Sequence, residues 1–323
     1  HGTGGYNIAI GNFAMDDTNA GSTSAASDHN IFIGNSAGGG TWTDVASNQN
    51  VAIGNYSMDS ALDGALNNTA VGYNSLSNIT TGDYNTVVGH SAGNALNTAT
   101  GNAILGYSAG DSITTSGYNA LLGYQAGAAL AGGSGQNIAI GYQPLYNGTS
   151  NSKVIAIGTR AGYYTTSDSN VYVGSSAGRE NRTGIGQVYI GSQAGYYTTG
   201  SYNTFVGQDA GLGGTTSAPF SSGGNNTAIG FQALKAFTTG YNNVILGYRA
   251  GYSTTTGYTN VYLGYQAGYR GTTARENIAI GSNSQQGVSG QTTGRYNVSL
   301  GVSSLFGLTT GTHNFVVGSN AGY

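Results

Sequence analysis

A short phrase recurs along the whole of this 323-residue chain. It consists of Asn, three mostly apolar residues and Gly, as in residues 85–89, 102–106 and 119–123, which follow one another at an identical step. A period this short indicates one supersecondary unit per copy, which buries its apolar residues only by stacking on its neighbours. We therefore predict an all-β parallel β-solenoid (β-roll), with one coil per repeat of about 17 residues and 18 repeats. The glycines that close the phrases, called marker glycines below, are Gly11, Gly34, Gly54, Gly72, Gly89, Gly106, Gly123, Gly141, Gly158, Gly174, Gly191, Gly207, Gly230, Gly247, Gly264, Gly281, Gly301 and Gly318.

Composition supports an ordered array. The 58 glycines and 7% charged residues would indicate low complexity if they were scattered, but the glycines occupy fixed phases of the repeat. Without cysteine the chain has no disulfide and no thiolate metal site. No apolar run is long enough to cross a bilayer, so we expect no membrane insertion. Because a continuous repeat is quasi-one-dimensional, we predict a single elongated domain over residues 1–323.

Charge is distributed unevenly along the chain. All nine Lys and Arg lie from Lys153 onward, whereas eight of the twelve acidic residues precede it, so residues 1–152 carry −8 and residues 153–323 carry +5. One interpretation is variation among surface loops. The other is an axial polarity that favours head-to-tail contact, which salt would screen beyond about 8 Å.

The three residues before each marker glycine form the expected strand. The last is Ile, Leu or Val in all 18 copies and the first is mostly Ile, Val, Thr or Ala, so we expect both to point into the coil. The middle residue should then face outward, although it is polar only at Ser299. A strand that is apolar on both faces is typical of one buried on both faces, so we expect other copies of the chain to cover the middle column. Its aromatic members are the predicted lateral self-association residues: Phe32, Tyr172, Tyr189, Phe205 and Tyr262.

Other phases of the repeat predict ladders and loops. Asn opens the phrase in 16 of 18 copies, with Val154 and Gln187 as exceptions, which indicates a stacked Asn ladder. Tyrosines directly after marker glycines, such as Tyr107, Tyr124, Tyr248 and Tyr265, predict a stacked aromatic ladder. Copies longer than the usual period must extrude the excess, and binding specificity would lie in those loops. They are Met15–His29, Gly40–Gln49, Leu212–Gly224 and Gln286–Arg295.

The residues that carry chemistry are sparse. The four histidines fall in different repeats without metal-ligand spacing, and Asp16-Asp17 is the one adjacent carboxylate pair. Two carboxylates could meet across coils as a glycosidase dyad, but no regular Asp marks a calcium-binding repeat and no phosphate-loop or dinucleotide pattern occurs. A net charge of −3 without a basic, aromatic face disfavours nucleic acid. We predict a protein that is not an enzyme and has no cofactor or metal.

The phrase Asn-x-Ala-Ile-Gly, in residues 50–54 and 277–281, resembles the head repeat of YadA-like trimeric autotransporter adhesins, and related phrases are similar to phage tail-fibre repeats. The resemblance covers nearly the whole chain, although this repeat is longer than the family's. It implies a parallel β-roll, left-handed in that family, with three chains side by side. It also implies that the middle strand residue faces a neighbouring chain while the flanking aliphatics face the interior.

Together these features predict a non-enzymatic structural or adhesive fibre protein, extracellular at a cell or virion surface, which associates with itself side by side and head to tail. The alternative is a trimeric receptor-binding or glycan-binding head whose specificity lies in the long loops. A more distant alternative is an ice-binding solenoid, suggested by the threonines, although their turns are of unequal length.

The two ends of the chain are in phase with each other. Residues 321–323 joined to residues 1–7 align without a gap on residues 194–203. The step from Gly318 across the junction to Gly11 also lies within the range of steps between neighbouring marker glycines. We therefore expect end-to-end stacking of subunits through His1, Tyr6, Ile10, Val317 and Tyr323. The alternative is that the chain is an excerpt of a longer repeat protein.

Overall fold

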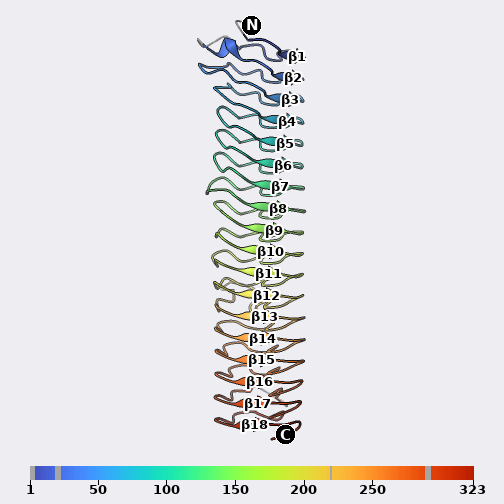
Figure 1. The fold of residues 1–323 in the computed structure, drawn as a ribbon, viewed down its shortest axis with the longest axis vertical. Helices are drawn as coiled ribbons and strands as arrows, with labels where there is room; N and C mark the ends of the chain where they lie inside the picture. The colour runs from blue at the N-terminus through green and yellow to red at the C-terminus, as the bar shows by residue number, and fades with distance from the viewer. Residues whose placement is uncertain (1–3, 19–22, 219, 288–291) are drawn as a thin grey trace. The chain divides into compact units, whose positions relative to one another are not determined.

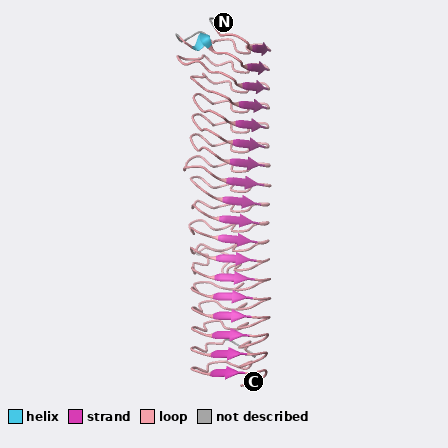
Figure 2. Ribbon diagram, in the orientation of Figure 1, coloured by secondary structure: helices cyan, strands magenta, loops and turns pink. Residues whose placement is uncertain are grey.

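The computed structural model describes residues 4–18, 23–218, 220–287 and 292–323. The fold is all-β, with 18 parallel strands of three residues each and one short 3₁₀ helix, η1 (Ser24–Ala26), in those ranges. Each strand lies just before a marker glycine, which confirms the predicted parallel β-solenoid with one coil per repeat (Figures 1 and 2). The chain divides into two compact units, residues 1–159 and 160–323, and the single-domain organisation stays a prediction.

Unit 1 stacks nine strands in chain order, and each pairs with the next in register. Middle residues therefore lie opposite middle residues, as Val87 lies opposite Ile104. The strands are β1 (Ile8–Ile10), β2 (Ile31–Ile33), β3 (Val51–Ile53), β4 (Thr69–Val71), β5 (Thr86–Val88), β6 (Ala103–Leu105), β7 (Ala120–Leu122), β8 (Ile138–Ile140) and β9 (Ile155–Ile157).

Unit 2 repeats this arrangement with nine more strands, again parallel and in register, as where Ile245 lies opposite Tyr262. They are β10 (Val171–Val173), β11 (Val188–Ile190), β12 (Thr204–Val206), β13 (Thr227–Ile229), β14 (Val244–Leu246), β15 (Val261–Leu263), β16 (Ile278–Ile280), β17 (Val298–Leu300) and β18 (Phe315–Val317).

The marker glycines end the strands, and two physical constraints require glycine there. Their φ angles lie between +126° and +146°, as at Gly141 (+131°) and Gly207 (+129°), where a side chain is strained. A Cβ on Gly141 would also lie 2.8 Å from the carbonyl oxygen of Gly158, and one on Gly207 would lie 2.6 Å from that of Gly230. The coils therefore approach each other through a column of bare backbone.

The predicted Asn ladder is confirmed inside both units. The side-chain oxygen of each Asn accepts hydrogen bonds from the backbone N–H and the side-chain amide of the next Asn, as between Asn85 and Asn102 at 3.1 and 3.0 Å. From the second coil to the seventeenth the Asn column is buried, and in most coils the amide also donates to a turn carbonyl, as Asn85 does to Ala99 at 2.8 Å. Val154 interrupts the column. In the same coil, the buried side-chain amide of Asn151 has no hydrogen-bond partner in the part of the chain that the structure describes.

The middle residue of the strand points into the coil. From β2 to β17 every middle residue is buried, whereas the flanking residues are half-buried or exposed. The predicted orientation, with the flanking aliphatics inside and the middle residue outside, is therefore wrong. The physical reason is that the buried Asn stands two residues before the middle position, and residues two apart on a strand share a face.

Candidate functional site

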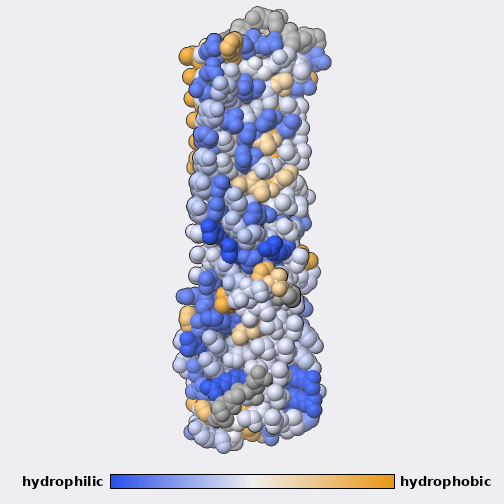
Figure 3. Space-filling model, turned by 180° about the vertical axis from the view of Figure 1, so that it is seen from behind, coloured by the Kyte–Doolittle hydropathy of each residue, from blue (hydrophilic) through white to orange (hydrophobic). Residues whose placement is uncertain are grey.

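The outward face of the strands is an uncovered apolar surface. It consists of the two flanking residues of each strand, and we call it the strand face. In unit 1, Leu105 and Leu122 are 48% and 44% exposed, and in unit 2 Leu263 is 43% exposed. Apolar residues gather along one edge of the N-terminal coils (Figure 3). Parallel sheets are normally covered on both faces, so this surface is unusual for a chain in water.

A shallow hollow of about 340 Å³ lies on the strand face of unit 1. It forms where the first strand residue is small, at Ala103 in β6 and Ala120 in β7, between the larger Val88, Leu105 and Leu122. Its lining is apolar except for Thr86. The hollow can accept a protruding apolar side chain from a partner surface.

An aromatic ladder follows the strand face directly after the marker glycines, as predicted. The rings of Tyr107 and Tyr124 stack at 5.2 Å between centroids and 8° between planes, and those of Tyr248 and Tyr265 stack at 5.2 Å and 4°. In unit 1 the stacked series runs Tyr73, His90, Tyr107, Tyr124 and Tyr142. These tyrosines remain nearly half-exposed, so their polar edges border the apolar columns.

The five residues predicted for lateral association lie inside the coils. Phe32, Tyr172, Tyr189 and Phe205 are 0% exposed and Tyr262 is 1% exposed, so none of them can contact another chain. Their prediction followed from the wrong strand orientation. The signal that sequence reasoning missed is the phase of the Asn column, which places the flanking aliphatics on the outer surface instead.

Burial changes the chemistry of the three tyrosines among them. The hydroxyl of Tyr172 accepts a hydrogen bond from the Asn181 amide at 2.6 Å, and that of Tyr189 donates to Gln187 at 2.9 Å. Because an ionised phenol would be stripped of water there, desolvation raises the pKa of Tyr172, Tyr189 and Tyr262 well above its ordinary value. These groups are structural and stay neutral at physiological pH.

The residues predicted for end-to-end contact are largely exposed. Tyr6 is 84% exposed, Tyr323 is 77% exposed, and Ile10 and Val317 are each 58% exposed. His1 lies outside the described residues. β1 and β18 belong to different units, so the predicted contact between them stays a prediction.

The long loop in unit 2 forms a second candidate site. The repeat from Gly207 to Gly230 is longer than the usual period. The chain leaves the coil after Gly214, whose N–H donates to the carbonyl of Phe237 at 2.6 Å, and rejoins it at Ser221, whose hydroxyl donates to that same carbonyl at 2.8 Å. Residues 215–218 and 220 are thus extruded between two fixed points, within the predicted range Leu212–Gly224.

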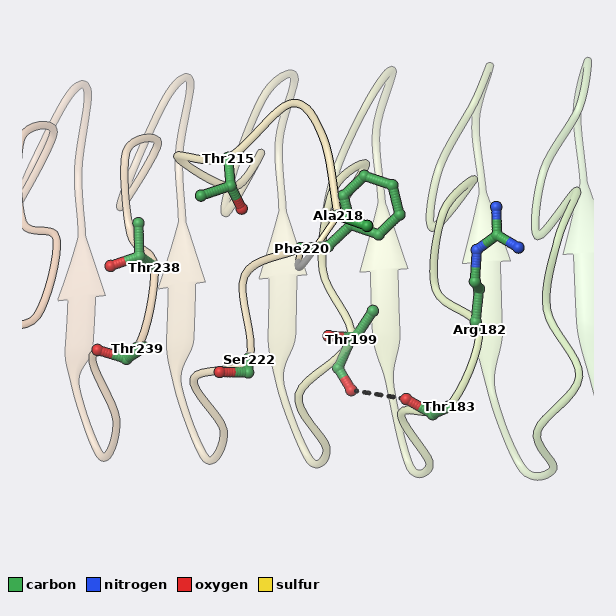
Figure 4. Close-up of a pocket in the computed structure, with 9 residues that line it drawn as sticks. All are labelled: Arg182, Thr183, Thr199, Thr215, Ala218, Phe220, Ser222, Thr238 and Thr239. Atoms are coloured by element: carbon green, nitrogen blue, oxygen red, sulfur yellow. Dashed lines mark hydrogen bonds between the residues drawn. The ribbon is translucent and has the colours of Figure 1, made fainter.

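The extruded residues wall a groove of about 510 Å³, drawn in Figure 4. The Phe220 ring lines the groove and stacks on the Tyr197 ring, with 5.9 Å between the ring centroids. Arg182 lies at one end of the groove, and Thr238 and Thr239 lie at the other (Figure 4). The Arg182 guanidinium is held 3.3 Å from a carboxylate oxygen of Glu180 and 4.7 Å from the ring centre of Tyr164. The rest of the lining includes the side chains of Thr183, Thr199, Thr215 and Ser222, and the exposed surface of the groove is mainly apolar. An aromatic ring, a fixed cation and a mainly apolar wall can bind a ligand that has an apolar face and a charged or polar group.

Other site classes find little support in the described residues. No group of three or more His, Asp and Glu that could hold a metal occurs in them, and no helix among them is long and apolar enough to span a membrane. Comparison with family models, curated proteins and solved structures gives no match for this chain. The similarity to YadA-like head repeats therefore rests on the residues alone.

Proposed function

We propose that this chain is a non-enzymatic, extracellular structural or adhesive fibre protein whose copies associate side by side through the strand face. The observation that carries the proposal is the uncovered apolar face of a parallel sheet, repeated coil after coil in both units. The outer columns, and not the buried aromatics, are the surfaces available for lateral contact.

The size of the effect explains why repetition is needed. Fully burying a Leu, Ile or Val contributes about 1.5–3 kcal/mol, so a residue that is about half-exposed contributes roughly 1 kcal/mol when a partner covers it. Association costs on the order of 4–15 kcal/mol in lost freedom. One coil cannot offset that cost, whereas two columns over the nine coils of one unit contribute on the order of 10–20 kcal/mol.

The test replaces two residues at the centre of the strand face of unit 1. We expect Leu105→Lys with Leu122→Lys to lower the association state, measured by sedimentation velocity over a range of concentrations and by electron microscopy. The matched control is Thr98→Lys with Thr115→Lys, which adds the same charge to the same two coils at exposed turn positions. Native protein that stays monomeric, or a strand-face variant that associates as the native protein does, would contradict the proposal.

End-to-end stacking of subunits is the second half of the proposal. It is supported by the exposed Ile10 in β1 and the exposed Val317 in β18. Electron microscopy also tests this contact. A bulky charged residue introduced beside Ile10 or Val317 should shorten the filaments. Filaments of unchanged length would count against this contact.

A receptor-binding or glycan-binding head is the second candidate function, and the groove beside residues 215–220 favours it. Deleting these residues restores the usual repeat length while keeping both anchors, Gly214 and Ser221. If the groove carries binding, the deletion abolishes ligand capture and leaves fibre assembly intact.

A further inference from the structure

A hydroxyl-rich groove with two arginines lies on the C-terminal coils of unit 2, apart from the strand face and the extruded loop. Its volume is about 450 Å³. Four successive coils each contribute a threonine and, two residues later, a second outward side chain. The threonines are Thr256, Thr273, Thr293 and Thr310, and the second residues are Tyr258, Arg275, Arg295 and Thr312.

The two arginines occupy adjacent coils in direct register. Arg275 and Arg295 form a parallel β-bridge, which places their backbones about 4.8 Å apart, and Arg295 bridges Thr312 in the same way. The Arg275 guanidinium donates to the hydroxyl of Tyr258 at 3.1 Å, which points it along the groove toward the preceding coil. Like charges placed directly opposite each other on neighbouring strands destabilise a sheet.

No carboxylate forms an ion pair with either arginine within the described residues. The four ion pairs found there involve neither of them, although Glu276 follows Arg275 in the chain. By contrast, Arg179, Arg182 and Lys235 in the same unit are each within ion-pair distance of an acidic side chain. The groove therefore presents two guanidiniums without a carboxylate partner, and apart from the Arg275 N–H bonded to Tyr258 their donors are available to an external anion.

We propose that this groove binds the sulfate or carboxylate groups of a linear acidic polysaccharide. Planar guanidiniums match such groups with paired hydrogen bonds, and threonine hydroxyls on each coil can both donate to and accept from sugar hydroxyls. A chain lying along the stack meets a threonine at every coil and a guanidinium at two adjacent coils, which suits a polymer of repeating sugars. Single-stranded nucleic acid fits less well, because Tyr258 is the one aromatic residue that lines the groove.

The test titrates the full chain with a sulfated polysaccharide, a polyuronate, neutral dextran, inorganic sulfate and single-stranded DNA, at low and at physiological ionic strength. We expect both acidic polysaccharides to bind, more weakly at the higher ionic strength, and dextran not to bind. Arg275→Gln and Arg295→Gln should each weaken binding about tenfold, since a charge-assisted hydrogen bond contributes at least about the 1.4 kcal/mol that corresponds to a factor of ten.

Arg270→Gln is the matched control, because it removes the same charge from the coil that carries Arg275 but outside the groove. We expect it to leave polysaccharide binding unchanged, and we expect circular dichroism melting to be the same for all three variants. Equal losses for Arg270→Gln would assign the binding to overall charge and overturn the site. Absence of polysaccharide binding, equal affinity for inorganic sulfate, or tighter binding of DNA would overturn the ligand class. In the background of Leu105→Lys with Leu122→Lys, Arg275→Gln should still weaken binding about tenfold, so this loss is independent of self-association.

Discussion

Removal of one amide from the middle of the Asn ladder should destabilise unit 1 far more than the loss of one surface polar group. Asn102→Ala deletes three hydrogen bonds at once. The Asn102 amide donates to Asn85 at 3.0 Å, and its side-chain oxygen accepts from the backbone N–H and the amide of Asn119 at 3.0 and 2.9 Å. All three residues are at most 2% exposed, so water cannot replace these bonds without opening the coil.

The expected magnitude follows from what each broken bond leaves behind. The amide of Asn119 keeps a 3.3 Å bond to the Ser116 carbonyl and Asn85 keeps the backbone N–H of Asn102, so these two losses cost about 0.5–1.5 kcal/mol each. The backbone N–H of Asn119 is left buried without a partner, which costs about 1–3 kcal/mol. We therefore expect the free energy of unfolding to fall by about 4 kcal/mol, within a range of roughly 2–6 kcal/mol.

Two measurements check this value. Urea unfolding followed by far-ultraviolet circular dichroism gives the change in free energy, and amide hydrogen exchange should show the loss of protection concentrated in residues 102–119. Asn314→Ala is the control, since Asn314 is only half-buried and its side-chain amide donates to Asn297 at 2.8 Å, and we expect it to cost less than about 1 kcal/mol. Equal costs for the two substitutions, or a loss below about 1 kcal/mol for Asn102→Ala, would refute the view that the buried ladder holds the coils together.

Two further predictions concern the marker glycines and the buried tyrosines. Gly106→Ala should lower the free energy of unfolding by more than about 3 kcal/mol, because φ is +146° and the new Cβ would meet the backbone of Gly123. Gly307→Ala is the control and should change this free energy by less than about 0.5 kcal/mol, because no atom lies within 4 Å of the new Cβ. Urea unfolding measures both, and equal effects would contradict the close approach of the coils. Tyr262 stays protonated in the fold, whereas its pKa in the unfolded chain is about 10. Its contribution to the free energy of unfolding is therefore constant below pH 10 and falls by about 1.4 kcal/mol per pH unit above it. Tyr262→Phe should make the decrease of this free energy with pH measurably less steep, and an unchanged slope would show that the Tyr262 hydroxyl ionises within the fold.

The coil itself could be predicted from the sequence because its signals are local and repeated. The positions of the marker glycines predicted where the strands lie. The recurring Asn predicted the hydrogen-bonded ladder, and Tyr107 and Tyr124, at the same position in successive repeats, predicted stacked rings. Each of these features depends only on the repeat, so most neighbouring pairs of coils show it.

The direction of the strand could not be read from hydrophobicity, because both sets of alternating positions are apolar and a shift of one residue exchanges the two faces. Two residues before Ile104, the buried Asn102 shares its face, and this polar column was the signal that would have determined the direction. The groove beside the extruded loop and the pairing of Arg275 with Arg295 could be found only from the structure. The step from Arg275 to Arg295 is longer than the usual period, so the sequence alone does not place them side by side.

Strict register between neighbouring strands has an evolutionary consequence. All coils but the one that carries Val154 meet the next through the same three groups, a bare glycine, a buried amide and an inward middle residue such as Ile104. A duplication or deletion of one whole repeat within a unit therefore keeps all three columns in phase, whichever coil it affects. The number of coils in such a gene is free to drift, whereas a marker glycine or a buried Asn of the ladder is not free to change.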